Sequence, residues 1–472
     1  MEEPEKVEVV GTKKQFAIYL AIVIAIGFLL YYLLKDTRQT LAATIFLATV
    51  IGTLMFWRFR VAIAFLGVVV LLLTRTIDLS HTIEFMSLDV ILFLVGMMVI
   101  VGLLRQSGFF RWLLVKALRF SKFEPKRLMI ILLVMSSVMA ALVDEVTSIL
   151  FVTALVLDLC DYCEVNPVRY IISVVLATNI GSSWTVLGNP IGILIALRSG
   201  LTFEDFLRSA LPVGVVSLLF LIPIILIWQR KDLRLLKEKA CAKMAKGEVG
   251  VLDEWAKVED KKLFIGSAVL FIVVVIFLAL HYRLELLLGL EHNTLLVAIP
   301  IAGAGIVMLW QRHRAAYYIL REVDWWTLTF FMFLFAKAGC LKYVGITDIM
   351  ADAMFNLTGG GGNVPLLTVV VLWISGFFSS ALDNVLVAAT LAPVIQSLTT
   401  HLSTPVLWWA LLFGGCYGGN MTMVGSTANI VALGILEGRK GYHMTFGYWI
   451  KIGLLCSLIP MAVGTVALLL FG

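Results

Sequence analysis

The chain has 472 residues, of which 61% are hydrophobic and 14% are charged, and its mean hydropathy is +0.99. Soluble domains carry about 25% charged residues and about half apolar ones, so this composition excludes an ordinary soluble domain and indicates a membrane protein. The net charge of +6 does not indicate nucleic-acid binding, because the Lys and Arg residues lie between hydrophobic runs and not in a separate basic domain.

The first half of the chain predicts membrane-spanning helices, because a span needs about 20 apolar residues. The uninterrupted apolar runs lie at residues 15–34, 38–55, 61–73, 88–104 and 210–227. The run at 128–142 is followed by Asp144 and Glu145 and then by a second apolar arm at 149–159. The run at 170–197 is broken by Gly and Pro near its middle, and a polar, Lys-rich loop is expected from 229 to 262.

The second half of the chain follows a similar order. Its uninterrupted apolar runs lie at residues 263–280, 294–310, 325–341 and 448–471. Another interrupted run has arms at 364–378 and 385–398, on either side of Asp383 and Asn384. The run at 406–436 is broken by Gly418-Gly419-Asn420.

Short sequences match between the two halves in the same order. Ala-Leu-Val-Asp-Glu-Val at 141–146 corresponds to Ser-Ala-Leu-Asp-Asn-Val at 380–385. Thr-Val-Leu-Gly-Asn-Pro at 185–190 corresponds to Thr-Met-Val-Gly-Ser-Thr at 422–427. Two further matches pair 106–109 with 343–346 and 201–203 with 444–446. Because the four landmarks keep nearly constant separations, we expect two structural repeats.

The Lys-rich loop is expected to be cytoplasmic, because cytoplasmic loops are enriched in Lys and Arg. We counted spans outward from this loop to assign a side of the membrane to every other segment. The other basic segments are also cytoplasmic only if each interrupted run is a re-entrant hairpin, which enters and leaves the membrane on the same side. The two repeats then cross the membrane in opposite directions. The predicted fold is an all-α polytopic membrane protein with two inverted repeats, about 11 transmembrane helices, two re-entrant hairpins and two broken helices.

This fold divides the chain into four segments. They are an N-terminal tail with an extra transmembrane helix at 1–37, a first repeat at 38–228 with its hairpin at 128–160, a basic cytoplasmic loop at 229–262, and a second repeat at 263–472 with its hairpin at 364–398. We expect a multi-pass protein of the plasma membrane with a cytoplasmic N-terminus.

Polar side chains at the two predicted hairpin tips are the first candidates for a functional site. Inverted repeats with broken helices place a binding site near the middle of the bilayer, where ionisable groups are costly and therefore usually functional. Asp144 and Asp383 are candidate Na⁺ ligands or proton carriers. Glu145 and Asn384 follow them directly, and Thr147 adds a hydroxyl. The alternative is that the carboxylates only cap the second arm of each hairpin.

The breaks in the two interrupted helices supply the second set of candidates. Gly and Pro open a helix, and Asn side chains then offer oxygen atoms and N–H groups to a ligand. The alternative is a Gly-rich face for close helix packing. The candidate residues in the breaks are Asn179, Gly188, Asn189, Asn420, Gly425 and Asn429.

Two further residues lie within or beside these segments. Lys337 lies inside the apolar run at 325–341 and is a candidate charge partner of Asp383, with extension of its side chain outward to water as the alternative. Cys416, at the second break, could meet a thiophilic substrate, but a buried inert thiol is the favoured interpretation.

The paired tips and paired Gly-rich breaks resemble the ion transporter superfamily over nearly the whole chain from residue 88 onward. Within it, the chain is most similar to the arsenite-pump and sodium/proton antiporter branch, the ArsB/NhaD type, which includes the melanosomal P protein. This resemblance implies that the tips and breaks form the site for substrate and coupling ion. Two departures concern the first repeat: Glu145 replaces the usual Asn, and Asn189-Pro190-Ile191-Gly192 replaces the usual Asp-Pro-Pro-Asn.

The leading hypothesis is a secondary active ion transporter that works by alternating access with proton or sodium coupling. It would be a sodium/proton antiporter or an arsenite or antimonite efflux carrier. The alternative is a sodium-coupled uptake carrier for an anion or dicarboxylate, although the acidic tips argue against organic dianions. We do not expect an enzyme, because intramembrane aspartyl proteases lack this inverted duplication.

The expected ligands and partners follow from the same interpretation. No cofactor is expected, and the coupling ion is H⁺ or Na⁺. The partners are the lipid bilayer and an inorganic ion, without nucleic acid. A homodimer and a cytoplasmic ATPase subunit docked on the loop at 229–262 are also compatible with the sequence.

Overall fold

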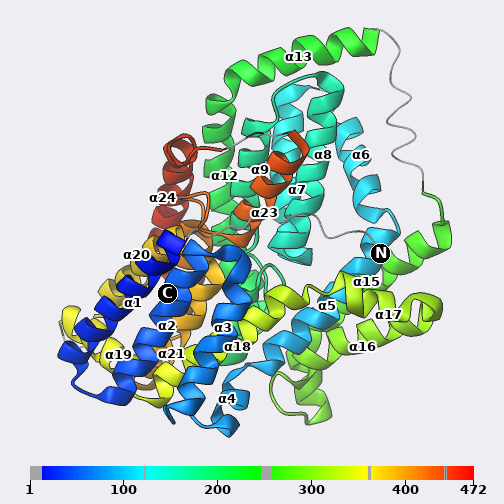
Figure 1. Cartoon of the computed structure of the whole chain (residues 1–472). Helices are drawn as coiled ribbons and strands as arrows, with labels where there is room; N and C mark the ends of the chain where they lie inside the picture. Colours follow the sequence, from blue (N-terminus) through cyan, green and yellow to red (C-terminus); the bar gives the residue numbers. More distant parts are fainter. Residues whose placement is uncertain are drawn as a thin grey trace. The chain divides into compact units, whose positions relative to one another are not determined.

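The computed structural model describes residues 13–121, 124–245, 258–359, 363–402, 404–440, 442 and 444–471. All regular elements in these residues are helices (Figure 1). Nine described helices are long and apolar enough to cross a membrane, and the number rises to 11 if each of two bent helix pairs is one span. The prediction of an all-α polytopic membrane protein is therefore confirmed.

The first part of the chain forms helices close to the predicted runs. These helices are α1 (Lys13–Leu34), α2 (Thr37–Met55), α3 (Arg60–Leu73), α4 (Leu79–Phe85), α5 (Leu88–Gln106) and α6 (Phe109–Phe120). The short helices α4 and α6 lie outside the predicted apolar runs. Residues 1–12 of the predicted N-terminal tail lie outside the described part of the chain.

Both interrupted apolar runs form two helices with a break at the acidic residues, as predicted. The four helices are α7 (Pro125–Val143), α8 (Glu145–Cys163), α20 (Val364–Ala381) and α21 (Asn384–His401). Pro lies in the first turn of α7 and of α20, where the missing backbone N–H would have had no helical partner. The start of the first arm of each hairpin is therefore favoured by the local sequence.

Both Gly-rich helices are broken where the sequence predicts. Their halves are α9 (Val168–Gly181), α10 (Pro190–Ser199), α22 (Val406–Gly418) and α23 (Thr427–Lys440). Each half is too short to cross a bilayer alone, because a span needs about 20 residues. The non-helical segment 182–189 is buried, and segment 419–426 is buried except for residues 423 and 424, which are half-buried. Irregular backbone inside a membrane is tolerated in such surroundings.

The rest of the chain differs from the prediction in four places. The Lys-rich segment is not wholly a loop, because it begins with helix α13 (Arg230–Ala245); its residues 246–257 lie outside the described part. Helix α15 (Lys261–Leu288) extends beyond the predicted residue 280. Two helices bend sharply: α16 (Thr294–Trp310) by 102° into residues 312–322, and α18 (Trp325–Tyr343) by 70° into α19 (Ile346–Leu357). The remaining long helices are α12 (Leu211–Trp228) and α24 (Phe446–Phe471).

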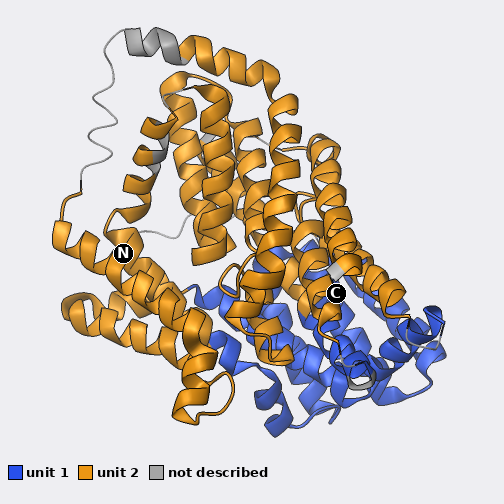
Figure 2. Cartoon of the chain, turned by 180° about the vertical axis from the view of Figure 1, so that it is seen from behind, with its two compact units in different colours: residues 1–91, 324–362, 389–402 blue, residues 92–323, 363–388, 403–472 orange. Residues whose placement is uncertain are grey.

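The chain forms two compact units that do not follow its order (Figure 2). Unit 1 contains residues 1–91, 324–362 and 389–402, and unit 2 contains residues 92–323, 363–388 and 403–472. Each unit therefore draws on both predicted repeats. Helix α21 begins in unit 2 and ends in unit 1.

Within unit 2, the first arm of each hairpin packs closely on the first half of a broken helix. Helix α7 lies on α9, and helix α20 lies on α22. A Cβ atom on Gly181 would lie 2.1 Å from the Ser137 carbonyl oxygen, and one on Gly418 would lie 2.2 Å from the Gly376 carbonyl oxygen. Matching positions of the two repeats thus make the same backbone approach.

A second contact recurs at matched positions. The Thr185 hydroxyl donates to the Ala141 carbonyl oxygen, and the Thr422 hydroxyl donates to the Ser380 carbonyl oxygen. In each case a break residue satisfies a backbone group next to a hairpin tip. The matched sequences therefore correspond to matched contacts, while the opposite orientation of the repeats across the membrane stays a prediction.

We predict that Gly181→Ala or Gly418→Ala destabilises the protein by about 1–3 kcal/mol, because the added methyl group forces two packed helices apart. Gly434→Ala is the control, since its Cβ would meet nothing within 4 Å. Thermal unfolding in detergent measures the difference. Equal melting temperatures for Gly181→Ala and Gly434→Ala would show that the helix approach is looser than described.

Candidate functional site

The first hairpin tip holds Asp144 in an unusual backbone conformation. Its φ is 126° and its ψ is 159°, a region that costs a non-glycine residue of order 1–3 kcal/mol. Its carboxylate Oδ1 accepts hydrogen bonds from the backbone N–H of Val146 at 2.8 Å and of Thr147 at 2.9 Å, and Oδ2 accepts from the Thr147 hydroxyl at 2.6 Å. Asp144 therefore caps α8, at the end where the helix dipole favours a negative charge.

The two hairpin tips meet directly at Glu145 and Asn384. The Asn384 side-chain amide donates to both carboxyl oxygens of Glu145, at 3.1 and 3.3 Å. Glu145 is 1% exposed and Asn384 is fully buried. These are the first residues of α8 and α21, so the positive ends of two helices lie beside one buried carboxyl group.

The surroundings of Glu145 contain acids and neutral groups. The carboxyl groups of Asp144 and Asp383 interact electrostatically with it, and the Ser182 hydroxyl lies nearby. Among the described residues no cationic side chain acts on Glu145. The Asn384 side-chain oxygen, also buried, has no hydrogen-bond partner within the described chain. The contact between the two tips therefore combines negatively charged carboxyl groups with a side-chain oxygen that has no hydrogen-bond partner in the described chain.

Asp383 ties the second hairpin tip to the second break. Its carboxylate accepts from the Val385 backbone N–H at 3.0 Å and from the Thr427 hydroxyl. Thr427 is the first residue of α23 and was not predicted as a site residue. Asp383 is 6% exposed, whereas its counterpart Asp144 is half-buried.

Asn179 connects the first break to the second. Its side-chain amide donates to the side-chain oxygens of Asn420 and Asn429, each at 2.8 Å, and its own oxygen accepts from the Ser426 hydroxyl at 3.1 Å. All four side chains are fully buried. Every polar atom of Asn179 thus has a partner, which is the condition under which a buried polar network is stable.

The other Asn side chains satisfy the open backbone of the breaks. The Asn429 amide donates to the carbonyl oxygens of Gly419 at 2.9 Å and Thr422 at 2.8 Å. Asn189 caps α10 by accepting from the Gly192 N–H at 2.9 Å, while its amide donates to Ser182 Oγ and Cys416 Sγ, both at 3.0 Å. These contacts fix the shape of the breaks around the tips.

The two site glycines permit a backbone approach that no other residue would. A Cβ on Gly188 would lie 2.1 Å from the Ser182 carbonyl oxygen. A Cβ on Gly425 would lie 2.6 Å from the Ser379 carbonyl oxygen and 2.7 Å from that of Gly419. Their role is therefore to close the breaks tightly.

The structure brings together all the predicted tip and break residues in unit 2, but Lys337 lies in unit 1. The Lys337 side-chain nitrogen donates to Thr49 Oγ1 at 2.7 Å and to the Ala64 carbonyl oxygen at 3.3 Å. The alternative prediction, that this side chain extends outward to water, is wrong because Lys337 is 1% exposed. Its pairing with Asp383 stays a prediction.

The residues that the sequence did not single out are Ser182 and Thr427. Both adjoin a Gly or Pro break, and that position is the signal that could have found them. Within the described residues, no group of three or more His, Cys, Asp or Glu side chains could hold a metal ion. The site instead offers carboxylate, amide and hydroxyl oxygens, which suit a proton or a hard cation such as Na⁺.

Comparisons with known proteins identify relatives along most of the chain. The CitMHS family model, described as citrate transporter, matches residues 46–414. An uncharacterized transporter of Mycobacterium tuberculosis (strain ATCC 25618 / H37Rv) is 33% identical over 388 residues, covering 80% of this chain and 85% of that protein. The P protein of Homo sapiens is 27% identical over 458 residues, covering 83% of this chain and 54% of that protein.

A solved structure supports the fold. The YdaH transporter of Alcanivorax borkumensis aligns with a TM-score of 0.55 over 83% of this chain and 86% of that chain. The two sequences are 16% identical, so the similarity concerns the fold alone. That fold is all-helical and polytopic, in agreement with the helices described above.

We predict that Asp144→Asn keeps the fold but loses ion-driven flux by about tenfold or more, because Asn can still cap α8 but cannot carry a charge. Asp144→Ala should lose the cap as well, at a cost of about 1 kcal/mol. Thermal unfolding and flux into liposomes are measured on the same preparations.

The control is Asp78, which caps the short helix α4 by accepting from the His81 N–H at 2.9 Å. Asp78→Asn and Asp78→Ala should leave flux unchanged. Wild-type flux in Asp144→Asn, combined with reduced stability in Asp144→Ala, would mean that Asp144 is only a helix cap.

Proposed function

The chain belongs to the CitMHS family of citrate transporters, within the ion transporter superfamily, and we propose that this secondary transporter couples its substrate to a proton or sodium ion bound at Glu145. The observation that carries the proposal is the buried contact between Glu145 and Asn384. As a member of a transporter family, the protein is not an enzyme.

The electrostatics of the tips favour a bound cation. A carboxylate buried in a low-dielectric environment without a cationic partner is costly, and a proton or Na⁺ removes that cost. Asn384 contributes a side-chain oxygen that has no partner in the described chain, and an oxygen of this kind is a suitable ligand for Na⁺. Asp144 and Asp383 add negative charge nearby.

The mechanism that fits this site is alternating access. The tips and breaks would stay around the ion while the surrounding helices open to one side of the membrane and then to the other. We propose that the Lys-rich segment containing α13 is cytoplasmic, as is the N-terminus, in a protein of the plasma membrane. Release of the ion then leaves a charged carboxylate. This carboxylate must bind another ion before the site can face the other side of the membrane again.

Sodium/proton exchange is the transport reaction that the acidic site supports best. One carboxyl group can hold a proton or Na⁺ but not both, so loading one ion releases the other. Arsenite or antimonite efflux has less support. Cys416 lies beside the site, yet its sulfur already accepts a hydrogen bond from Asn189.

Citrate is the second candidate, and the family description favours it. Citrate carries several negative charges at neutral pH, so three carboxyl groups around the site would repel it. Uptake of citrate therefore requires cations that enter with it, which corresponds to the sodium-coupled anion carrier considered from the sequence. The side-chain N–H groups of Asn179, Asn189 and Asn384 already donate within the protein, so they would have to exchange these partners to bind such a substrate.

A liposome screen with an internal pH-sensitive dye and an internal Na⁺-sensitive dye distinguishes these reactions. Na⁺, Li⁺, arsenite and citrate are added in turn to vesicles that contain the full chain. Na⁺-driven alkalinisation or acidification without citrate supports exchange, whereas proton or Na⁺ movement that needs citrate supports uptake. If no added solute moves protons or Na⁺, the proposed coupling is wrong.

We predict that Glu145→Gln abolishes coupled flux, with a decrease of about 100-fold, because the amide cannot exchange a proton or bind Na⁺ as a charge. The fold should persist, since Gln can keep the contact with Asn384. The matched control is Glu291→Gln, at an exposed residue in the turn between α15 and α16. Flux in Glu145→Gln that equals flux in Glu291→Gln would contradict a role of Glu145 in coupling.

A further inference from the structure

A lysine is buried inside unit 1, and the coupling mechanism proposed above does not use it. Lys337 lies on α18, about 9 Å before the end of the helix at Tyr343. Helices α18 and α19 together are a candidate membrane span, and Lys337 is 1% exposed. An ionisable group inside a membrane span is costly, so a functional role is the first hypothesis for it.

Three helices of unit 1 meet at the Lys337 nitrogen. Its Nζ atom donates to Thr49 Oγ1 on α2 and to the Ala64 carbonyl oxygen on α3. The Thr49 hydroxyl donates in turn to the Ile45 carbonyl oxygen at 2.9 Å, so its oxygen is left to accept from the lysine. Two neutral oxygen atoms from two helices therefore hold the nitrogen.

Gly67 on α3 leaves the space that the Lys337 nitrogen occupies. A Cβ atom on Gly67 would lie 3.4 Å from Lys337 Nζ, 3.4 Å from Thr49 Oγ1 and 3.1 Å from Ile45 Cγ2. A larger side chain would push the nitrogen away from its two acceptors. The three helices thus form a fitted site around this nitrogen.

No acidic side chain in the described part of the chain neutralises Lys337. The helices packed against α18 are α2, α3, α4 and α19. Their charged or titratable side chains are Arg38, Arg60, His81, Glu84, Asp348 and Asp352. The other titratable side chains of α18 itself are Cys340, Lys342 and Tyr343.

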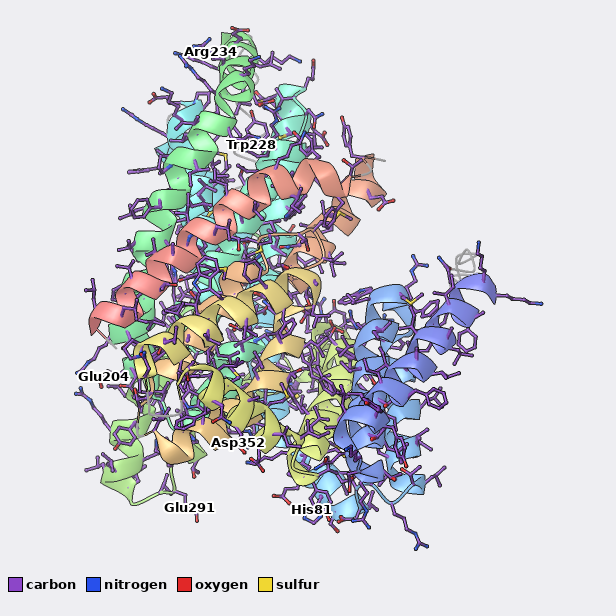
Figure 3. The ribbon with its side chains drawn as sticks, turned by 90° about the vertical axis from the view of Figure 1, so that its left-hand side faces the viewer. His81, Glu204, Trp228, Arg234, Glu291 and Asp352 are labelled. Atoms are coloured by element: carbon purple, nitrogen blue, oxygen red, sulfur yellow. The ribbon has the colours of Figure 1, made fainter. Side chains whose placement is uncertain are left out.

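None of these groups bonds to Lys337, and no titratable group of the described chain acts on it electrostatically. Figure 3 shows His81 and Asp352 at the periphery of unit 1. Lys342 and Tyr343 are exposed. The surroundings of the Lys337 nitrogen are therefore uncharged.

The number of acceptors fits a neutral amine. An ammonium group has three N–H donors and no acceptor, whereas a neutral amine has two N–H donors and a lone pair. The described chain supplies two acceptors, so an ammonium group would keep one N–H unpaired. A buried charge without a partner also costs far more than a buried polar group with hydrogen bonds. Both arguments favour the neutral amine in this conformation.

We propose that Lys337 is a second proton-binding site of the transport cycle, neutral while it is buried and protonated when a change of conformation opens it to water. The proton adds to the nitrogen lone pair, no covalent bond of the side chain breaks, and unit 1 gains one positive charge. Burial of the site again requires release of that proton. The role in transport rests on the proposed proton coupling, whereas proton binding at Lys337 does not depend on Glu145.

Nitrogen NMR of the full chain in lipid, with nitrogen-15 in the lysine side chains, tests proton binding. Amine and ammonium nitrogens differ in chemical shift. The wild type should show one lysine amine at neutral pH, and this signal should convert to the ammonium form as the pH falls. Lys337→Met should lack the amine signal. Glu145→Gln should keep it, so a failure of coupling at Glu145 is distinguishable from a failure at Lys337.

Two results of this titration would overturn the proposal. The first is a spectrum in which every lysine is an ammonium group at neutral pH. The second is an amine signal that does not change with pH or that persists in Lys337→Met.

Flux into liposomes, measured on the same preparations, tests whether the proton belongs to the cycle. Met can replace the aliphatic part of the lysine, so thermal unfolding of Lys337→Met should show that the fold persists. Its proton-driven flux should decrease by about tenfold and should no longer change over the pH range in which the amine signal converts. Lys342→Met, at an exposed residue of the same helix, is the matched control and should behave as the wild type. A wild-type rate and pH profile in Lys337→Met would contradict the proposed role.

Discussion

Backbone polar groups inside a bilayer must find partners within the protein, and this constraint governs the centre of unit 2. Two hairpin tips and two helix breaks leave helical geometry there, and they satisfy one another. Thr185 and Thr422 bond the carbonyl groups beside the tips, and Asn179 joins the first break to the second. The site is thus a consequence of the interruptions, because only polar side chains could stabilise them.

The two repeats make matched contacts but differ in one residue at the hairpin tip. Asp144 and Asp383 occupy equivalent tip positions, but the next residue is Glu145 in one repeat and Asn384 in the other. The amide of the second faces the carboxyl group of the first, so a symmetric framework contains an asymmetric pair. Two carboxylates at these positions would repel each other, and two amides could not exchange a proton.

Much of this arrangement could be predicted from the sequence, because the signals are local. Acids inside apolar runs located the tips, and Gly, Pro and Asn located the breaks. The contacts of Ser182 and Thr427 with the acids could not be predicted, because they join residues far apart in the chain. The predicted end of helix α15, at residue 280, was too early because it too depends on contacts between separate segments. His281 and Glu285 interrupt its apolar run, yet Glu285 is buried and accepts from the Leu295 N–H at 2.7 Å.

Infrared difference spectroscopy of the full chain in lipid tests most directly whether Glu145 carries the coupling ion. Spectra are recorded as Na⁺ replaces a larger inert cation at constant pH, and again as the pH changes at constant Na⁺. The wild type should show a carboxyl band whose intensity falls when Na⁺ is added, and this change should be missing from Glu145→Gln. An identical carboxyl change in Glu145→Gln, or no change in the wild type under either condition, would contradict ion binding at Glu145.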